Sequence, residues 1–416
     1  MERITATYLI ETPHEVEKAA AVLAGEQSSG TFVSVPGETE ELKTRFAARV
    51  EAIEELGEAS GPSMPGDPGA NKVYKRAKVT VSWSIENFGY NIPTLISTLQ
   101  GNLYELRQFT GLKLDDFEVP DSYGDVFRGP RFGMAGTKQL ASVGSERPMI
   151  GTIIKPSVGL TAEYTADLVK TLAEAGIDFV KDDELMSSTS NSPFKIRVEK
   201  IMRVINDFAD KTGKKIMYAF NITGDLDTMR ANYDTIVKAG GTCAMVSINS
   251  VGWAGVKMVC DRGQLSIHGH RNGWGMINRH PLLGINFPAY NKIWRLAGVD
   301  QMHVNGIKNK FWESDDSVVR SIKSCHTPFL KNESVIPVVS SGQWGGQAFE
   351  TYKRTHTTDL LYMAGGGIMA HPSGPTGGVK ALHQSWACAV DGLTLEEAAK
   401  QHKEFGESVE KFGKSK

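Results

Sequence analysis

Eight short runs of apolar and β-branched residues recur from about residue 150 onward, and they restrict the possible folds more than any other feature of the sequence. Examples are "MIGTIIKP", "IMYAFN" and "VIPVVSS". Such near-continuous apolar runs are typical of parallel strands that are buried on both faces of a sheet. The runs begin near residues 149, 177, 216, 243, 264, 300, 335 and 360.

The segments between these runs favour helices. After Pro193, the apolar residues Val198, Ile201 and Ile205 follow the three- and four-residue spacing of one helical face. Eight strands that alternate with helices over about 250 residues predict a (β/α)8 barrel. A doubly wound open sheet is the alternative, but it would typically carry a glycine-rich fingerprint after its first strand, and none is present there.

The first 125 residues have a less regular pattern. "ITATYLIE" predicts a strand, as does the alternation of Val79, Val81 and Trp83 with polar residues. "PHEVEKAAAVLAGE", "ETEELKTRFAARVEAIEEL" and "NIPTLISTLQGNLYEL" predict helices. We therefore expect an α+β domain with an antiparallel sheet over residues 1–125. A (β/α)8 barrel domain with a C-terminal helical extension would follow over residues 126–416.

Composition argues against several classes of protein. A net charge of -2 and the lack of a long Lys/Arg-rich run give no electrostatic reason to expect a nucleic-acid or membrane partner. No apolar run approaches 18 residues, and the N-terminus lacks a signal-peptide core. The four scattered cysteines show no metal-ligand spacing, so we interpret them as reduced thiols. A cytoplasmic protein is therefore expected.

Chemically active side chains collect where the eight runs end. In a (β/α)8 barrel, the carboxyl ends of the strands form the active site. Polar residues at such positions can simply mark the exit of the chain from the core. A lysine, an acidic pair, a His/Arg set and a further histidine on different strands nevertheless favour a functional site. In strand order these residues are Lys155; Lys181, Asp183 and Glu184; Asn221; Asn249; His268, His270 and Arg271; His303; Ser340, Ser341 and Gly342; and Gly365, Gly366 and Gly367.

The acidic pair indicates a metal site. Asp183 and Glu184 offer the oxygen ligands that suit Mg²⁺, whereas the His/Cys clusters of zinc sites are missing. Lys155, on the neighbouring strand, could act as a base beside the metal. An ordinary salt bridge to Asp183 is the alternative for this lysine.

The last two strand ends indicate a phosphate site. The turns "SSG" and "GGG" expose backbone N–H groups with little obstruction from side chains. Arg271 could bind a second anionic group with two hydrogen bonds. A metal, a base and a phosphate pocket together suggest a sugar-phosphate-like substrate, from which an enediolate would form by loss of a proton or a carbon substituent.

Two of these segments resemble the RuBisCO superfamily. "GTIIKPSVGL" resembles the first barrel strand, where the family's lysine, here Lys155, handles the substrate proton. "GIDFVKDDE" resembles the family's metal motif. The resemblance implies that Lys181 takes up CO2 as a carbamate and then binds Mg²⁺ together with Asp183 and Glu184.

Further motifs extend the resemblance over nearly the whole chain. "IHGHRNGWG", "QMHVNG", "VVSSGQ" and "MAGGGIMAHPSG" match the segments that supply two active-site histidines, a phosphate-binding arginine and two phosphate turns. "GEQSSGTF" and "QGNLYEL" match segments that reach the active site of the partner subunit, which implies a homodimer or a higher assembly of dimers with shared sites. The residues implied are His270, Arg271, His303, Ser340, Gly342, Gly365, Gly366, Glu26, Thr31 and Asn102.

The sequence also departs from the true carboxylases and is more similar to RuBisCO-like proteins. Ser157 stands where carboxylases have a second lysine, and Trp274 stands where a further histidine is expected. Ser341 replaces a usual glycine. In the loop after the sixth strand, Lys310 is the better match to the lysine that closes over the substrate, and Lys308 is the alternative.

The resemblance implies an enzyme that retains the enolising half of RuBisCO chemistry. The first expectation is cleavage of a carbon–carbon bond in 3-oxo-isoapionate 4-phosphate, by a decarboxylase or a transcarboxylase/hydrolase. Decarboxylation of a 3-oxo acid forms an enediolate directly, without the second lysine. One alternative is an enolase or isomerase of a methylthio-sugar phosphate in sulfur salvage, with Trp274 as an apolar slot. Another is a non-catalytic scaffold.

Overall fold

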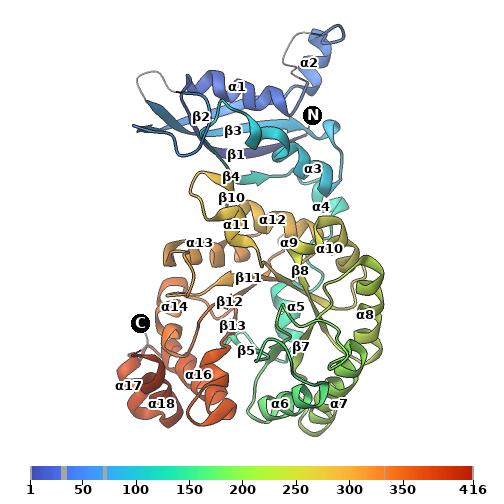
Figure 1. Cartoon of the computed structure of the whole chain (residues 1–416), viewed down its shortest axis with the longest axis vertical. Coiled ribbons are helices and arrows are strands. Elements are labelled where there is room, and N and C mark those ends of the chain that lie inside the picture. The colour runs from blue at the N-terminus through green and yellow to red at the C-terminus, as the bar shows by residue number, and fades with distance from the viewer. Residues whose placement is uncertain (1, 30–34, 69–72, 332, 415–416) are drawn as a thin grey trace. The chain divides into compact units, whose positions relative to one another are not determined.

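The chain forms two compact units, seen in Figure 1. The computed structural model describes residues 2–29, 35–68, 73–331 and 333–414. The first unit consists of residues 1–128 and 273–296, and the second of residues 129–272 and 297–416. Residues 273–296, which the sequence-based division assigns to the barrel domain, thus pack with the first unit.

The first unit is built on a five-stranded sheet with the strand order β10-β4-β1-β3-β2. Its strands are β1 (Arg3–Thr12), β2 (Arg49–Ala59), β3 (Tyr74–Ser84), β4 (Gly111–Glu118) and β10 (Leu283–Ile285). All neighbouring pairs are antiparallel except β10 with β4, which are parallel. The predicted strand is confirmed, and Val79, Val81 and Trp83 are all buried. Burial alternates as predicted only up to Val81, because Ser82 and Ser84 are buried as well. The helices are α1 (Val16–Glu26), α2 (Glu40–Phe46), η2 (Ile85–Asn87), α3 (Ile92–Leu99), η3 (Gly101–Glu105), α4 (Tyr123–Val126), α11 (Trp274–Asn278) and α12 (Phe287–Ala297).

The helix predicted from "ETEELKTRFAARVEAIEEL" is wrong in its second half. The helix α2 ends at Phe46, and residues Arg49–Ala59 form the edge strand β2. Every residue of this strand is exposed or half-exposed, so burial of an apolar face does not explain why the segment is a strand. Its good helix formers are held extended by pairing with β3, an example of tertiary context overriding local propensity.

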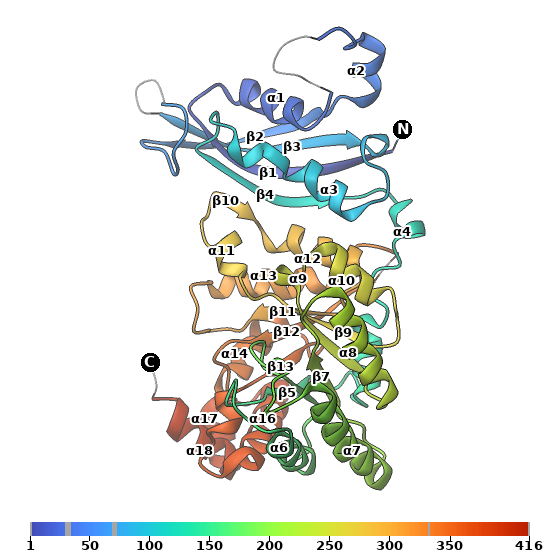
Figure 2. The same ribbon diagram turned by 45° about the vertical axis from the view of Figure 1, so that its right-hand side comes forward.

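The second unit is a closed barrel of eight parallel strands, which confirms the predicted (β/α)8 fold (Figure 2). Each strand coincides with one of the eight apolar runs. The strands are β5 (Met149–Ile153), β6 (Phe179–Lys181), β7 (Met217–Asn221), β8 (Cys243–Ser247), β9 (Ser266–His270), β11 (Gln301–Asn305), β12 (Ile336–Ser340) and β13 (Leu361–Met363).

Helices surround this barrel and follow its strands along the chain. Those that follow the strands are α6 (Ala162–Glu174), α7 (Phe194–Thr212), α8 (Leu226–Lys238), α9 (Ile248–Val251), α10 (Trp253–Cys260), α13 (Asp315–His326), α14 (Gly346–Thr355), α15 (Gly366–Met369) and α16 (Gly374–Val390). The helix α5 (Gly133–Leu140) precedes the first strand. The expected C-terminal extension comprises α17 (Leu395–Gln401) and α18 (Lys403–Phe412), with Phe405 buried among their apolar neighbours. Of the described helices, none is long and apolar enough to cross a membrane.

The barrel interior is filled with apolar side chains. Met149, Phe179, Met217, Met245 and Leu361 are fully buried in one cluster with their neighbours on the other strands. Gly151 leaves room for this packing, because a Cβ there would lie only 3.0 Å from a methyl carbon of Leu361. A packed interior of this kind leaves the strand ends as the places where a substrate can bind.

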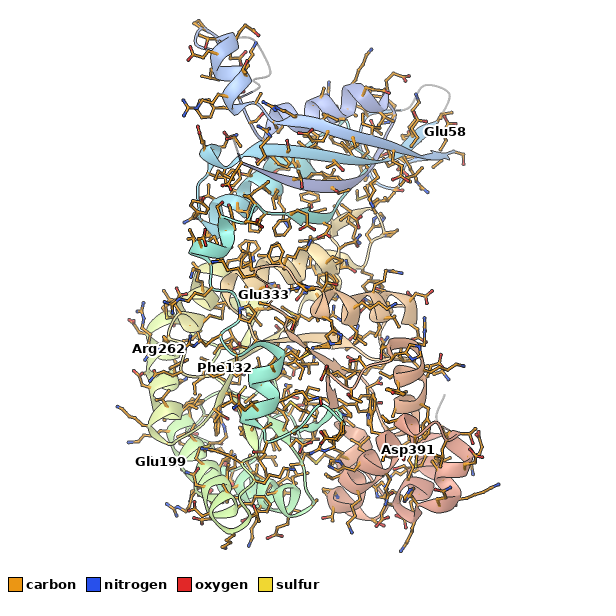
Figure 3. All side chains as sticks on the ribbon, turned by 180° about the vertical axis from the view of Figure 1, so that it is seen from behind. Glu58, Phe132, Glu199, Arg262, Glu333 and Asp391 are labelled. Atoms are coloured by element: carbon orange, nitrogen blue, oxygen red, sulfur yellow. The ribbon has the colours of Figure 1, made fainter. Side chains whose placement is uncertain are left out.

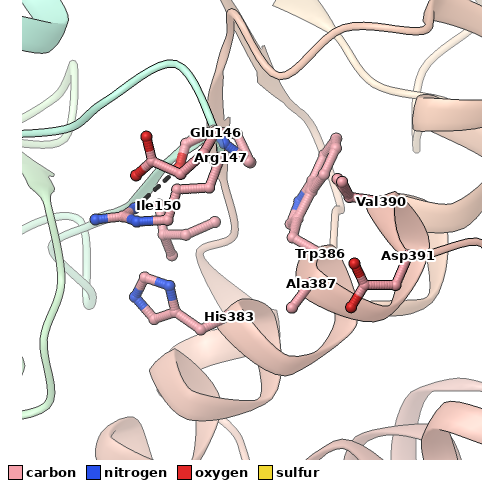
Figure 4. A pocket seen from close by; sticks show the side chains of 9 residues that line it. Glu146, Arg147, Ile150, His383, Trp386, Ala387, Val390 and Asp391 are labelled. Carbon is pink, nitrogen blue, oxygen red and sulfur yellow. Dashed lines mark hydrogen bonds between the residues drawn. The ribbon is translucent and has the colours of Figure 1, made fainter.

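The amino-terminal end of the barrel is closed by ion pairs. The buried carboxylate of Asp178 accepts hydrogen bonds from Arg147 (2.6 Å) and Lys214 (2.7 Å). Arg147 also donates to the carbonyl of Pro148, and it lines a pocket of about 270 Å³ beside Trp386 of α16 (Figure 4). This pocket lies at the start of β5, at the end of the barrel opposite the predicted catalytic residues.

Asp300, at the start of β11, joins three segments of the second unit. Its Oδ1 accepts hydrogen bonds from the backbone N–H groups of Phe132 (2.6 Å) and Gly133 (2.9 Å), where α5 begins. Phe132 is labelled in Figure 3. The Oδ2 atom of Asp300 accepts a hydrogen bond from the backbone N–H of Ile267 in β9 (2.8 Å). Burial raises the pKa of Asp300 to about 6, although the backbone N–H groups oppose this rise.

This raised pKa gives a testable dependence of stability on pH. Because the folded pKa lies above the ordinary value, the folded protein binds more protons than the unfolded chain between about pH 4 and 6. The wild type should therefore gain unfolding free energy relative to Asp300→Asn as pH falls through this window, by at most about 3 kcal/mol. Urea unfolding of both proteins at several pH values measures the difference, and a difference independent of pH would contradict the prediction.

Candidate active site

Most of the predicted catalytic side chains of the second unit lie at the carboxyl ends of its strands; His303 is the exception, because its strand continues to Asn305. Lys155 follows β5 by two residues, and Lys181 is the last residue of β6. His270 and Ser340 end β9 and β12, and His303 lies in the middle of β11. One rim of the barrel thus carries the candidate metal ligands, both histidines and the phosphate turns.

Lys155 and Asp183 form an ion pair on this rim. The Nζ of Lys155 lies 2.6 Å from Asp183 Oδ2 and also donates to Ser157 Oγ (2.8 Å). Burial raises the pKa of Asp183, but the hydrogen bond from Lys155 and other favourable contacts outweigh it, so the net pKa is lowered. The salt bridge considered from sequence is therefore present. It holds the ammonium group of Lys155 at the rim, and the lysine side chain is still 42% exposed.

Lys181 is buried beside the acidic pair. Only 1% of the residue is exposed, and its Nζ lies 2.8 Å from the carbonyl oxygen of Asp182, 3.4 Å from Met245 Sδ and 3.5 Å from Glu184 Oε2. Burial lowers the pKa of Lys181, although the nearby carboxylates oppose this shift. The neutral amine that burial favours is the form that can react with CO2.

These residues fit a magnesium site that includes a modified lysine. Among the residues that the structure describes, no three His, Cys, Asp or Glu side chains converge as a metal site. Asp183 and Glu184 supply two carboxylates, and a carbamate formed on Lys181 would place further oxygens next to Glu184. Three oxygen ligands of this kind match the preference of Mg²⁺.

Asp182 points away from the candidate metal ligands. Its carboxylate accepts hydrogen bonds from Tyr218 Oη (2.6 Å), the backbone N–H of Asn221 (2.9 Å) and Arg197 of α7 (3.3 Å). The side chains of Asp182 and Arg197 are both fully buried. Asn221 in turn donates to the carbonyl oxygens of Glu184 and Met186. The loop that carries the candidate ligands is therefore anchored from the outer side of β6.

His270 and His303 lie next to each other and to Glu184. The Nε2 of His270 is 3.4 Å from Glu184 Oε2, and the two imidazole rings are 4.5 Å apart. The backbone N–H of Asn272 donates to His270 Nδ1, so a proton on Nε2 would face Glu184. Burial lowers the pKa of both histidines well below the usual value, which favours their neutral forms.

His303 is held by the last residue of β12, at the edge of the candidate phosphate turn. Its Nδ1 is hydrogen-bonded to Ser340 Oγ (3.1 Å). Its Nε2 is buried and has no hydrogen-bond partner among the described residues. His268, in contrast, is fully buried, bonds to Gln301 and stacks on Phe179, which makes it a core residue.

Arg271 is paired with Glu313, a residue that the sequence did not single out. The Nη2 of Arg271 donates to Glu313 Oε2 (3.1 Å), and both residues are at least 95% buried. Asn305 and Ser317 also donate to this carboxylate, at 2.6 and 2.7 Å. In the sequence, Glu313 is one of several charged residues in a loop. It shows no pattern that separates it from its exposed neighbours.

The turns after β12 and β13 pack against each other. A Cβ at Gly367 would lie 2.7 Å from the carbonyl oxygen of Gln343, so only glycine allows this approach. The buried amide of Gln343 donates to the carbonyl of Ile307 and accepts from Tyr362. It thereby fixes the first turn to the loop after β11. Gly365 and Gly366 lie on the second turn, and a Cβ at Gly366 would meet only open space.

Of the two candidate loop lysines, Lys310 lies beside the first turn. The backbone N–H of Lys310 donates to the carbonyl of Ser341 (3.3 Å). A Cβ added at Gly342 would lie 3.4 Å from the Cβ of Lys310. Lys308 instead donates its backbone N–H to Asp315 at the start of α13. The choice of Lys310 over Lys308 as the lysine that closes over the substrate stays a prediction.

The predicted residues of the first unit are only partly described. Glu26 ends α1, Asn102 lies in η3, and Thr31 lies outside the described residues. The two helix segments meet, because the side chain of Gln27 lies against Gly101. Glu26 and Asn102 are thus brought to one region of this unit.

Trp274 does not form an open apolar slot. It begins α11 in the first unit and is 5% exposed. Its ring packs against Tyr290, with centroids 4.6 Å apart, and against Phe287. Trp274, which the sequence suggested as an apolar slot for a methylthio group, therefore contributes to packing within the first unit.

The backbone at Ser341 explains why glycine is usual there, and it predicts how substitutions behave. Its φ of 76° lies in the left-handed region, which favours glycine, while its Oγ donates to Asn305 Oδ1 (2.7 Å). Ser341→Ala should lower the unfolding free energy by about 1 kcal/mol through loss of this hydrogen bond. Ser341→Gly should be closer to the wild type, because glycine relieves about 1 kcal/mol of backbone strain. Urea unfolding compares the three proteins, and an alanine variant at least as stable as the glycine variant would contradict this account.

Comparison with known proteins agrees with this arrangement. The family model described as the ribulose bisphosphate carboxylase large chain, N-terminal domain, matches residues 2–123, and the model of its catalytic domain matches residues 135–412. A crystal structure of a rubisco-like protein from Burkholderia fungorum superimposes with a TM-score of 0.92 at 42% identity, covering 99% of this chain and 100% of the other.

Two relatives of similar length have named activities. A 3-oxo-isoapionate-4-phosphate decarboxylase from Rhizobium rhizogenes is 46% identical, and the match covers 99% of each chain. A 3-oxo-isoapionate-4-phosphate transcarboxylase/hydrolase from Xanthobacter autotrophicus is 49% identical over 96% of each chain. Both family models and these full-length relatives confirm the predicted kinship: the chain belongs to the RuBisCO large-chain family, as a RuBisCO-like protein.

Proposed function

We propose that the protein cleaves the carbon–carbon bond to the carboxyl group of 3-oxo-isoapionate 4-phosphate, as a decarboxylase or as a transcarboxylase/hydrolase. The observation that carries this proposal is the 46% and 49% identity, over nearly the full length, to enzymes named for these two reactions. The Lys155–Asp183 pair, 2.6 Å apart at the barrel rim, supports it because it supplies the acid–base group that such a reaction needs.

Lys181, as a carbamate, would hold Mg²⁺ together with Asp183 and Glu184. The burial of Lys181 and its 3.5 Å distance from Glu184 support this ligand set. Bound Mg²⁺ would supply positive charge that stabilises negative charge developing on the substrate oxygens. The anchoring of Asp182 on Arg197 would keep the neighbouring ligands in position.

The phosphate of the substrate would bind to the turns after β12 and β13. Their backbone N–H groups and the adjacent Lys310 provide the donors and the positive charge for it. The family residues implied here are Ser340, Gly342, Gly365 and Gly366. Neutral His270 and His303 would then hydrogen-bond the hydroxyl or carbonyl oxygens of the carbon chain.

Lys155 would move the proton in the reaction. When the carboxyl carbon leaves as CO2, the electron pair of the broken bond stays on the substrate as an enediolate. The Lys155 ammonium, held by Asp183, can donate a proton to the carbon that lost the carboxyl group. In the hydrolytic variant, a water molecule adds to the 3-oxo carbon, and the bond between this carbon and the neighbouring carbon breaks. The former oxo carbon becomes a carboxylic acid, and the neighbouring carbon, which keeps the electron pair, takes up a proton.

Glu26, Thr31 and Asn102 would complete the site from a partner subunit, in a homodimer or a larger assembly of dimers. This part of the proposal rests on the matching family motifs. A cytoplasmic location is also proposed, and the buried free thiols of Cys243, Cys260 and Cys388 support it. The argument for sulfur-salvage activity relied on Trp274 as an apolar slot for a methylthio group. This argument is weakened, because Trp274 packs against Tyr290 in the first unit.

Turnover of 3-oxo-isoapionate 4-phosphate tests the proposed function. Enzyme incubated beforehand with Mg²⁺ and bicarbonate should consume this compound, and a chelator should remove the activity. NMR follows the products. Release of CO2 would identify a decarboxylase, whereas incorporation of oxygen from H2¹⁸O into a product acid would identify a hydrolase. Turnover of methylthioribulose 1-phosphate alone would contradict the proposal, and inertness toward both compounds would favour a scaffold.

Replacement of Lys155 tests its role as the proton donor. Lys155→Met should lower kcat/KM by about 10²- to 10⁴-fold, which is the usual contribution of a general acid or base. Lys195→Met is the matched control, because Lys195 is an exposed lysine on α7 that forms a surface ion pair with Glu199. It should leave kcat/KM unchanged. Retention of wild-type activity by Lys155→Met would exclude this lysine as the proton donor.

A further inference from the structure

The pair formed by Arg271 and Glu313 is a buried charge pair at the barrel rim. Arg271 is 5% exposed and Glu313 is 4% exposed, and their contact is 3.1 Å from Nη2 to Oε2. Arg271 directly follows β9, and Glu313 comes shortly before α13. The pair therefore lies next to His270, on the side of the rim formed by β9 and β11.

The Glu313 carboxylate is held in place by more than the arginine. Its Oε2 also accepts from Asn305 (2.6 Å), and its Oε1 accepts from Ser317 in the first turn of α13 (2.7 Å). Asn305 in turn accepts a hydrogen bond from Ser341 on the first phosphate turn. Glu313 thus cannot leave Arg271 without breaking a network that extends to this turn.

This network changes the charge that a ligand meets at the rim. A buried carboxylate at 3.1 Å cancels most of the attraction that Arg271 would exert on an anion, and the low dielectric around the pair strengthens this cancellation. A phosphate group brought to Arg271 would also meet the negative charge of Glu313. The turns after β12 and β13, with Lys310 beside them, are the more favourable place for a dianion.

We propose that Glu313 is a specificity-determining residue: by neutralising Arg271, it suits the site to a substrate with a single phosphate and disfavours a bisphosphate. The phosphate binds at the β12–β13 turns, and the β9–β11 side receives an uncharged, hydroxylated end of the substrate. The inference rests on the proposed function for its monophosphate substrate. The charge argument itself concerns any anion that enters the site.

Calorimetric binding of two unreacted probes tests this role. Ribulose 5-phosphate and ribulose 1,5-bisphosphate are titrated into the Mg²⁺- and bicarbonate-treated protein. The wild type should bind the bisphosphate no more tightly than the monophosphate. Glu313→Gln keeps the size of the side chain and removes its charge, so it should bind the bisphosphate at least about tenfold more tightly than the wild type does. Its affinity for the monophosphate should change by less than about threefold.

Two further measurements separate charge from structure. Ser317→Ala removes one hydrogen bond to the same carboxylate and keeps its charge, so the ratio of the two affinities should stay at the wild-type value. An equal change of both affinities in Glu313→Gln would overturn the inference and indicate a structural role. If Glu313→Gln does not fold, the two affinities of the wild type test the proposal. Bisphosphate binding tenfold tighter than monophosphate binding would overturn it.

The outcomes also separate this inference from the proposed function. Turnover of 3-oxo-isoapionate 4-phosphate without a shift in the affinity ratio would overturn the role of Glu313 and leave the function standing. A shift in the ratio in a protein that does not turn over this compound would overturn the function and leave the charge effect of Glu313 standing.

Discussion

The hydrogen bonds to the buried carboxylate of Asp182 determine the geometry of the acidic end of β6. Arg197 of α7, Tyr218 of β7 and the backbone of Asn221 hold Asp182 on the outer side of the barrel. Because successive side chains alternate along an extended segment, this fixes Lys181 and Asp183 on the inner side. Removing the carboxylate partner of a buried arginine is strongly destabilising. Separation of Asp182 from Arg197 in the folded protein is therefore costly, and the contact stays formed. The position of the candidate metal ligands therefore depends on Asp182, which is not itself a candidate ligand.

The charges of the site are controlled mainly by burial. Burial lowers the pKa of Lys181, His270 and His303, and all three are favoured in their neutral forms. Asp183 is the opposite case, since its pair with Lys155 keeps it ionised. The buried amine of Lys181, the two buried imidazoles and the more exposed ammonium group of Lys155 thus differ in charge, although they lie on one rim. Local environment thus separates Lys155 and Lys181, two lysines that the sequence alone would treat as equally basic.

The sequence predicted the barrel and most of its rim because both follow from local pattern. A strand buried on both faces leaves an apolar run, and a strand end in a (β/α)8 barrel leaves a polar residue after it. Three features lacked such a signal. The strand β2 is built from helix formers and is held extended by β3, and β10 has only three residues. Glu313 is a loop carboxylate whose importance arises only when folding brings it to Arg271.

Two features act in the same direction on the charge of the rim. Ser157 stands where a second lysine is expected from the family resemblance, and its hydroxyl accepts a hydrogen bond from Lys155. Glu313 neutralises Arg271 on the other side. Addition of CO2 to an enediolate builds negative charge on the substrate, and a second phosphate adds more. A rim with less positive charge stabilises such a product less. Loss of the carboxyl group from a substrate with one phosphate builds less negative charge. The proposed roles fit this smaller demand, because Lys155 would donate the proton and Lys310, whose backbone lies beside the first turn, would attract the phosphate.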